Sequence, residues 1–505
     1  MQNYMHRLFC EESMIEIIEQ VNNAINGVVW GTAGIALLLV AGLVMTAVNR
    51  GFQFTHLAHW ISKTIGAIFT DKHITAHTAR ENKAISQFQS LCTAMAATIG
   101  TGNIVGVATA IILGGPGAIF WMWIMALVGM MTNYSENVLG IYFRQKSASG
   151  EWRGGAMYYL KEGLGGYKGL KTVGTVLAVL FSVFCLLASF GIGNMSQVNS
   201  IASNMQSAFN VPSWVTGVAL MVIAALVVLG GLKRVATVTE KLVPFMAVLY
   251  IAGALIVVFM HASAVPAVFA SIFRGAFATS AAGGGIVGYG VKSAITWGFK
   301  RGAFSNEAGL GSSVMVHSSS NVKEPVQQGM WGIFEVFADT IVVCTLTALV
   351  VLTSGSVDLE TGRMLTENAG AGLVGEAFGT VFGHYGQKFI AIAILLFAFS
   401  TSLGWSHYGS TAWQYLFGEK SIILYKAVFV AMIFFGCTMR LSLAWDLSDT
   451  FNGLMMIPNL IGVLSLSPLV ARITANYVKR VIRGESEEAL LSAYTKVEER
   501  QKEVV

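Results

Sequence analysis

The chain has 505 residues, of which 54% are hydrophobic and 12% are charged, and its formal net charge is +5. Soluble domains are about one quarter charged, so this chain has too few charges to cover a globule of its size. No block of Lys and Arg is interleaved with aromatic residues, which argues against a nucleic-acid partner. The lipid bilayer is therefore the expected environment, and apolar runs able to cross its core of about 30 Å recur along the chain.

The N-terminal residues and the cysteines predict neither processing nor a cofactor. Residues 1–23 include Glu11, Glu12, Glu16 and Glu19, whereas a signal peptide begins with basic residues. The five cysteines are scattered, and no pair has the spacing of metal ligands. Their odd number argues against a disulfide framework. No Ser/His/Asp set or HExxH motif is present, so we expect no enzyme, no cofactor and no obligate protein partner.

Apolar segments predict an all-α polytopic membrane protein with about eleven transmembrane helices. In chain order they lie at residues 25–48, 88–112, 117–142, 172–198, 213–230, 241–260, 273–298, 328–353, 388–416, 421–438 and 443–470. The segment at 273–298 is the least typical because several glycines interrupt it.

Basic residues alternate between successive loops, and this pattern predicts the orientation of the chain. The loops after the first, third, fifth, seventh and last spans carry Arg50, Lys63, Lys72, Arg80, Lys83, Arg144, Lys146, Arg153, Lys161, Lys168, Lys171, Lys233, Arg234, Lys241, Lys300, Arg301, Lys323, Arg472, Lys479, Arg480 and Arg483. In contrast, residues 199–212 contain no Lys or Arg. We expect a multi-pass protein of the bacterial cytoplasmic (inner) membrane, with residues 1–24 outside and the tail, residues 471–505, in the cytoplasm.

A glycine-rich stretch, TIGTGNIVG, occupies residues 98–106 in the middle of the second span. Its spacing is G-x-G-x-x-x-G and no strand precedes it, so it is not a dinucleotide-binding loop. Either Gly102 and Gly106 form a small-residue face for close helix packing, or the helix is broken near Gly100. A break inside a membrane persists only where protein or a watery cavity covers it.

A second stretch, AAGGGIVG, occupies residues 281–288, five spans after the first. Counted from the span at residue 88, the interrupted helices are the first and sixth of ten. This pattern is typical of an inverted five-plus-five repeat, with repeats at 88–260 and 265–470 and a transport site between the broken helices. The segment 25–48 is then an extra N-terminal helix.

The motifs that carry these features resemble one known family. They are AMAATIGTGNIVGVA at residues 94–108, GGPGAIFWMW at 114–123, KRGAFSNEAGLGS at 300–312, GNMSQ at 193–197, DT at 339–340 and FSTSLGW at 399–405. Together they resemble the alanine/glycine:cation symporter family over residues 25–470. The resemblance implies a leucine-transporter-like fold, with sodium as the coupling ion and a small neutral amino acid as substrate.

The resemblance also implies how a zwitterionic substrate binds. At the break around Gly100, the backbone N–H groups of Thr101 and Gly102 face the carboxylate, helped by the positive end of the half-helix. Gln197 is either a polar contact to the substrate or an interhelical hydrogen bond. The ammonium group is expected to meet carbonyl groups at the second break, around Ala281, Gly283 and Gly284. Trp405 and Phe277 are expected to wall a cavity that suits a very small side chain.

For sodium, the resemblance to the superfamily implies oxygen ligands from two helices. Carbonyl groups of Ala96, Ile99 and Ala398 are expected to join the hydroxyl groups of Thr401 and Ser402. The alternative is that these hydroxyls bond only to the preceding helical turn. A second ion is conceivable near three further residues, which are Thr98, Asn103 and Thr279.

Acidic residues inside the spans leave a second mechanism open. Glu335 and Asp339 lie one turn apart in the eighth span, so the rival function is a proton-coupled amino-acid transporter on the same fold. A channel is a further rival, because it requires no coupling. Asn306 and Glu307, beside Lys300 and Arg301, are expected to help form the inner gate.

Overall fold

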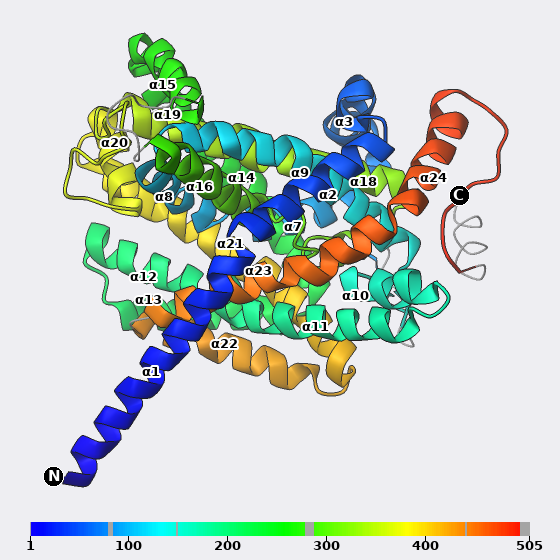
Figure 1. Cartoon of the computed structure of the whole chain (residues 1–505), viewed down its shortest axis with the longest axis horizontal. Coiled ribbons are helices and arrows are strands. Elements are labelled where there is room, and N and C mark those ends of the chain that lie inside the picture. The colour runs from blue at the N-terminus through cyan, green and yellow to red at the C-terminus, as the bar shows by residue number, and fades with distance from the viewer. Residues whose placement is uncertain (1, 79–83, 148–149, 278–286, 440–441, 495–505) are drawn as a thin grey trace.

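The computed structural model describes residues 2–78, 84–147, 150–277, 287–439 and 442–494. These residues form an almost entirely helical bundle (Figure 1), with one small antiparallel sheet of β1 (Gln145–Lys146) and β2 (Trp152–Arg153). The predicted all-α fold is therefore confirmed.

The elements of the first third are α1 (Gln2–Val29), α2 (Thr32–Val48), α3 (Phe52–Thr55), α4 (Leu57–Ile61), η1 (Ser62–Gly66), α5 (Ala67–Thr70), α6 (Lys72–Thr75), α7 (Gln87–Thr98), η2 (Thr101–Asn103), α8 (Val105–Gly114) and α9 (Gly117–Tyr142). The middle third contains α10 (Ala156–Tyr158), η3 (Tyr159–Gly163), η4 (Leu164–Gly166), α11 (Lys171–Phe190), η5 (Gly191–Met195), α12 (Ser196–Phe209), α13 (Ser213–Val228), α14 (Leu232–Met260), η6 (Ala262–Ala264) and α15 (Val265–Phe277). The last third contains α16 (Val287–Asn306), α17 (Val314–His317), α18 (Pro325–Val336), η7 (Phe337–Cys344), α19 (Thr345–Thr353), α20 (Ala371–Phe382), α21 (Tyr385–Phe417), α22 (Ile422–Thr438), α23 (Ser442–Ser465), α24 (Ser467–Tyr477) and η8 (Val478–Ile482).

Six helical stretches among the described residues are long and apolar enough to cross a membrane. They are Glu16–Val48, Gly117–Tyr142, Lys171–Phe209, Leu232–Met260, Pro325–Thr353 and Tyr385–Phe417. A bent pair, Asp446–Ser465 with Ser467–Ile482, adds a seventh candidate with a bend of 58°. Other predicted spans correspond to shorter helices such as α13 and α22, so the count of about eleven stays a prediction.

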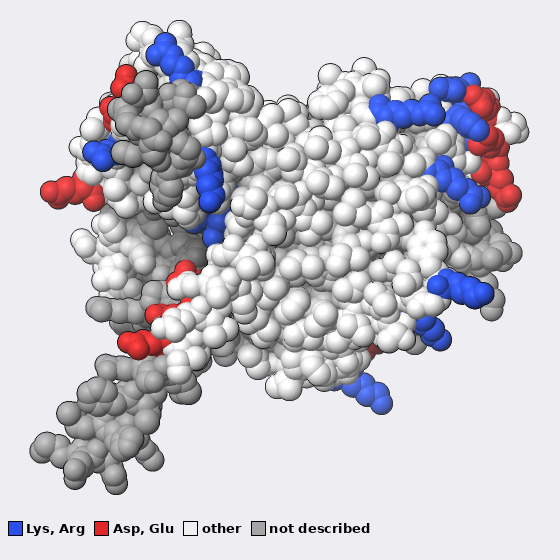
Figure 2. All heavy atoms as spheres, viewed as in Figure 1, with Lys and Arg blue, Asp and Glu red and all other residues white. Residues whose placement is uncertain are grey.

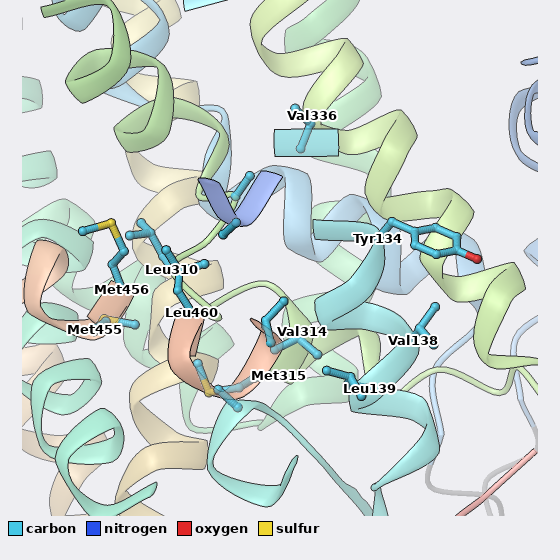
Figure 3. Close-up of a cluster of buried hydrophobic side chains, with 14 of the residues drawn as sticks. Tyr134, Val138, Leu139, Leu310, Val314, Met315, Val336, Met455, Met456 and Leu460 are labelled. Carbon is cyan, nitrogen blue, oxygen red and sulfur yellow. The ribbon is translucent and has the colours of Figure 1, made fainter. Parts of the chain in front are cut away.

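Helix α9 packs against α2, α16 and α18. Lipid is as apolar as the side chains, so close packing rather than water exclusion holds such helices together. Small residues make this possible: a Cβ on Gly117 of α9 would lie 2.1 Å from the carbonyl carbon of Gly275 in α15. Figure 3 shows the apolar core on another side of α9, formed by Tyr134, Val138, Leu139, Leu310, Val314, Met315, Val336, Met455, Met456 and Leu460.

One sequence-based assignment is corrected by the helix boundaries. The predicted span 273–298 overlaps the last residues of α15, up to Phe277, and the start of α16, from Val287; residues 278–286 lie outside the described residues, so this span stays a prediction. Lys300 and Arg301 lie inside α16, and not in a loop after it. Lys300 forms an ion pair with Asp449 of α23 at 2.6 Å. Because Lys300 and Arg301 are helical, they do not count toward the charge of a loop in predicting the orientation of the chain.

Candidate functional site

The predicted first break is confirmed. Helix α7 ends at Thr98, Ile99 and Gly100 are non-helical, and the chain re-enters helix through η2 and α8. The side chain of Asn103 holds the turn, because its Oδ1 accepts a hydrogen bond from the Gly100 N–H at 2.9 Å. The break is fully buried, so protein covers the irregular backbone as a membrane requires.

A second buried break follows α16, at residues 307–313. Glu307, Gly309 and Gly311 have φ angles of +55°, +92° and +72°, a left-handed conformation that glycine adopts without cost and glutamate rarely adopts. Asn459 of α23 supports the loop by donating to the Gly309 carbonyl at 2.9 Å. The chain then resumes as α17. The break predicted at residues 281–288 falls mainly on 278–286, which lie outside the described residues.

The two described breaks face each other. A Cβ on Gly102 would lie 3.1 Å from a ring carbon of Phe304, at the end of α16. Asp339 of η7 joins both sides, because its carboxylate accepts hydrogen bonds from Asn103 Nδ2 at 2.6 Å and Ser305 Oγ at 2.8 Å. Thr340 adds a third donor at 2.8 Å. One fully buried carboxylate thus connects both broken helices.

A small cavity of about 10 Å³ lies between the breaks. Its lining combines backbone, aromatic and polar groups from five helical regions: Ala97, Thr98, Gly100, Gly102, Ile192, Gln197, Phe304, Glu307, Thr401, Trp405 and Asn452. Glu307 is only 3% exposed, and its carboxylate accepts hydrogen bonds from Trp405 Nε1 at 2.9 Å and Ser312 Oγ at 2.5 Å. The buried Asn452 Oδ1 has no hydrogen-bond partner in the described part of the chain.

A second cavity of about 260 Å³ lies next to the first and is lined by Thr101, Gly102, Val105, Gly106, Thr109, Arg301 and Phe304. Gly102 and Phe304 line both cavities, so the Phe304 ring stands at the boundary between them. The Arg301 guanidinium lies 5.6 Å from that ring. A cation therefore faces the larger cavity, beside the ring that separates it from the smaller one.

The structure brings the predicted sodium residues of α7 and α21 together. Thr401 Oγ1 lies 3.4 Å from the Ile99 carbonyl oxygen, and Ser400 Oγ lies 3.4 Å from the Ala96 carbonyl oxygen. Thr401 and Ser402 also bond back to the carbonyl groups of Phe397 and Ala398. The local bonding of the alternative hypothesis is thus present, together with the convergence of oxygen atoms that an ion site needs.

The predicted substrate residues are only partly gathered. Gly100, Gly102, Gln197 and Trp405 line the small cavity, and Gln197 Oε1 accepts a hydrogen bond from the Thr101 N–H at 3.4 Å. Ala281, Gly283, Gly284 and Thr279 lie outside the described residues, so their assignment is untested. Phe277 is 59% exposed and packs on Phe120 of α9 instead of walling the cavity.

Five residues of the small cavity have no substrate or ion role in the sequence-based prediction. Ala97, Ile192, Phe304 and Asn452 carry no predicted role, and Glu307 is predicted at an inner gate. The NEAGLGS sequence at residues 306–312 carried the signal, because an acid and two glycines between apolar segments are typical of a covered break.

A second buried polar cluster involves Glu335 of α18. His317 Nε2 lies 3.0 Å from Glu335 Oε2, and its Nδ1 lies 2.5 Å from Gln328 Nε2. Both side chains of this acid–imidazole pair are fully buried. Neither lines the small cavity, so the pair does not contact a substrate there.

Comparison with known proteins gives a match along most of the chain. The model of the sodium:alanine symporter family matches residues 15–490. The sodium/alanine symporter AgcS of Methanococcus maripaludis is 43% identical over 448 residues, covering 89% of this chain and 94% of that protein. A probable sodium/glutamine symporter of Bacillus subtilis is 36% identical over 473 residues, 93% of each chain. A solved manganese transporter of Eremococcus coleocola superposes with a TM-score of 0.49 at 13% identity, covering 86% and 87% of the two chains.

Proposed function

The chain belongs to the sodium:alanine symporter family, and from this premise we propose that it imports alanine or glycine together with sodium. The observation that carries the proposal is the small cavity between two facing helix breaks, with the Glu307 carboxylate on one side and the backbone of Gly100 and Gly102 on the other. Broken helices of this kind bind the ionic groups of a substrate and its coupling ion in secondary transporters.

The substrate carboxylate is assigned to the first break. The N–H groups of Thr101 and Gly102 lie at the start of the half-helix that continues as α8, where the helix dipole favours an anion. The Thr101 N–H is held only by a long bond of 3.4 Å to Gln197, so a carboxylate can replace that contact.

The ammonium group is assigned to the second break. Glu307 supplies negative charge and Asn452 Oδ1 supplies an unpartnered acceptor. A buried carboxylate is costly unless it is paired, and a bound ammonium would provide the opposite charge. Carbonyl groups of Ala281, Gly283 and Gly284 remain an alternative on residues that the structure does not describe.

Selectivity for a small side chain follows from the cavity walls. Trp405, Phe304 and Ile192 leave space of about 10 Å³, which is too small for any amino acid until a wall moves. Phe304 is the wall shared with the larger cavity, so rotation of its ring is the simplest way to admit alanine. We assign Phe304 as the gate through which substrate reaches the site.

Sodium is assigned to the oxygen atoms between α7 and α21. Carbonyl oxygens of Ala96, Ile99 and Ala398, with the hydroxyls of Thr401 and Ser402, are hard ligands of the kind that such cations prefer. A second cation can be held by Asp339 with its neighbours Asn103 and Ser305. Because ion binding there would fix both breaks at once, it explains how an ion prepares the site for substrate.

Proton coupling is the second candidate, because Asp339 is a buried carboxylate at the junction of both breaks. Uptake of alanine into proteoliposomes distinguishes the two functions. We expect uptake under an inward sodium gradient, and little under a potassium or proton gradient alone. Equal rates under all three would exclude sodium coupling, and competition by alanine, glycine and glutamine would identify the substrate.

A further inference from the structure

A groove of about 310 Å³ lies between the start of α3 and the C-terminal helix pair α24 and η8, a size within the range of small-molecule sites. Its floor includes the fully buried Phe52 ring and Ala471, and its walls include Val48, Val478 and Ile482. None of its residues lines the central cavity between the breaks. The groove is therefore separate from the proposed transport site.

The adjacent segment shows where the membrane surface meets this groove. Phe54, Leu57 and Ile61 are 57%, 49% and 39% exposed, and their spacing places them on one face of the α3–α4 segment. Gln53 and Trp60, on the adjoining side of the segment, are buried. A short helical segment with one exposed apolar face lies in the interface between lipid headgroups and acyl chains. On this argument the groove beside it is expected at headgroup depth.

The rim of the groove is cationic. Arg50 stands where α2 ends, in a left-handed turn with a φ of +56°, and its exposed guanidinium has no hydrogen-bond or ion-pair partner among the described residues. Arg483 lies across the groove and has only a long contact of 3.8 Å to Glu485. Lys479 also lines the groove, but its ammonium is neutralised by Glu487 at 2.6 Å.

His56, the remaining titratable residue of the rim, adds no positive charge. Burial, and then the nearby Arg483 guanidinium, lowers the pKa of His56, so the imidazole is neutral at neutral pH. Figure 2 shows the Lys and Arg side chains gathered over the ends of α3 and α24, with acidic side chains beside them. Two arginines therefore line an apolar-walled groove, Arg50 without a side-chain partner among the described residues and Arg483 with a long ion pair to Glu485.

We propose that this groove binds the phosphate headgroup of an anionic phospholipid from the adjoining leaflet. The two guanidinium groups bind the phosphate, because arginine forms paired charge-assisted hydrogen bonds with phosphate oxygens. Val48, Val478 and Ile482 contact the start of the acyl chains. A zwitterionic lipid binds less well, because its ammonium group would stand beside two arginines. Basic pockets between membrane helices hold anionic lipids in this way.

Native mass spectrometry of the full-length protein tests the proposal, with phosphatidylglycerol and phosphatidylethanolamine as probes. We expect one phosphatidylglycerol to be retained preferentially and to raise the melting temperature. In the double variant Arg50→Gln/Arg483→Gln the affinity for that lipid should fall by about tenfold or more. The matched control is Lys168→Gln/Lys171→Gln, which removes two exposed cations elsewhere and should bind like the unmodified chain.

Three outcomes would overturn the proposal. These are equal retention of both lipids, equal loss in the control variant, and the same thermal shift from inorganic phosphate alone, which would indicate a free-anion site. If the double variant does not fold, the single variant Arg483→Gln, at the exposed end of η8, is compared with the control Lys171→Gln. An unchanged affinity of Arg483→Gln for phosphatidylglycerol would also count against the site.

Discussion

Asn103 of η2 donates a 2.6 Å hydrogen bond to Asp339 of η7, inside the buried core of the bundle. Ser305, at the end of α16, donates to the other oxygen of the same carboxylate. The two helix breaks are thus connected through one side chain that belongs to neither. A substitution at Asp339 therefore alters hydrogen bonds at both halves of the proposed transport site.

Replacing this carboxylate by an amide should disturb both breaks. Asp339→Asn keeps the size but puts an NH₂ group among three donors, so at least one of them loses its acceptor. An unpaired buried donor costs about 1–3 kcal/mol, and we expect initial alanine uptake to fall at least about tenfold. Thr340→Val removes one donor to the carboxylate, and also the acceptor of Asn306 Nδ2 at 3.0 Å. It keeps the carboxylate and its other two donors, so a smaller loss is expected. Equal uptake by Asp339→Asn and the unmodified chain in proteoliposomes would refute a coupling role.

Thr401→Ala tests the assignment of the first sodium site. The hydroxyl lies 3.4 Å from the Ile99 carbonyl oxygen. Its removal deletes one proposed sodium ligand, and the smaller alanine side chain adds no steric conflict. The sodium concentration for half-maximal uptake should rise by about fivefold or more, a loss of roughly 1 kcal/mol. Thr411→Ala is the control, because that hydroxyl bonds only locally, to His407 of the same helix. An unchanged sodium requirement would contradict the assignment of Thr401 as a sodium ligand.

The glycine breaks show what local sequence can and cannot predict. The first break was predictable because Gly100 and Gly102 stand beside the polar Asn103, which can satisfy a freed backbone group. The predicted break at residues 281–288 lies mainly outside the described residues and stays a prediction, whereas the described break at Gly309 and Gly311 was not predicted. Glycine density measures backbone freedom only. Whether a chain actually breaks depends on distant partners, here Asn459 of α23.

The cavity lining could not be predicted for the same reason. Phe304 faces the cavity because α16 ends directly beside Gly102, a contact between residues some two hundred positions apart. Glu307 follows Lys300 and Arg301 in the sequence, but its carboxylate accepts hydrogen bonds from Trp405 and Ser312. The position of Gly100 at the break follows from a local motif and was predictable, whereas the roles of Gly100 and Thr401 in binding stay predictions.

Gly100→Ala should block transport by steric conflict at the first break. A Cβ there would lie 2.4 Å from Thr401 Oγ1 and 3.4 Å from Gln197 Oε1, which is too close to Thr401 for any relaxed structure. We expect uptake below about one tenth of that of the unmodified chain. Gly166→Ala is a matched control, because a Cβ at that position meets nothing within 4 Å. Normal sodium dependence in Gly100→Ala would show that this backbone is not packed as described.

Glu307→Gln separates a binding role from a gating role. The amide oxygen can still accept from Trp405, so the loop is retained, but the charge opposite the ammonium is lost. Charged hydrogen bonds contribute about 1.5–3 kcal/mol, so the KM for alanine should rise by about tenfold or more while the sodium requirement changes little. Increased leak of preloaded alanine with a normal KM would instead support the inner-gate interpretation. A variant with both unchanged would exclude both roles.

Arg144→Gln tests how the segment after the second break is held. The guanidinium, 1% exposed, donates to the carbonyl oxygens of Ser318, Ser320 and Val322, and the same segment forms a bridge with Ile85 just before α7. Arg144 thus ties the end of α9 to both half-helices, α7 and α17. Its replacement leaves three carbonyl groups without a charged donor, and we expect the chain to lose about 3 kcal/mol or more of stability.

The readout for Arg144→Gln is the melting temperature in detergent together with the rate of alanine exchange. A lower melting temperature with faster exchange is expected, because a loosened α17 segment exposes the site more often. Arg144→Lys should restore only part of both, since an ammonium group cannot donate to three separate carbonyls in the fork geometry of a guanidinium. The control Lys168→Gln removes an exposed charge and should change neither quantity. If Arg144→Lys behaves like the unmodified chain, the positive charge alone is sufficient and the fork geometry has no role.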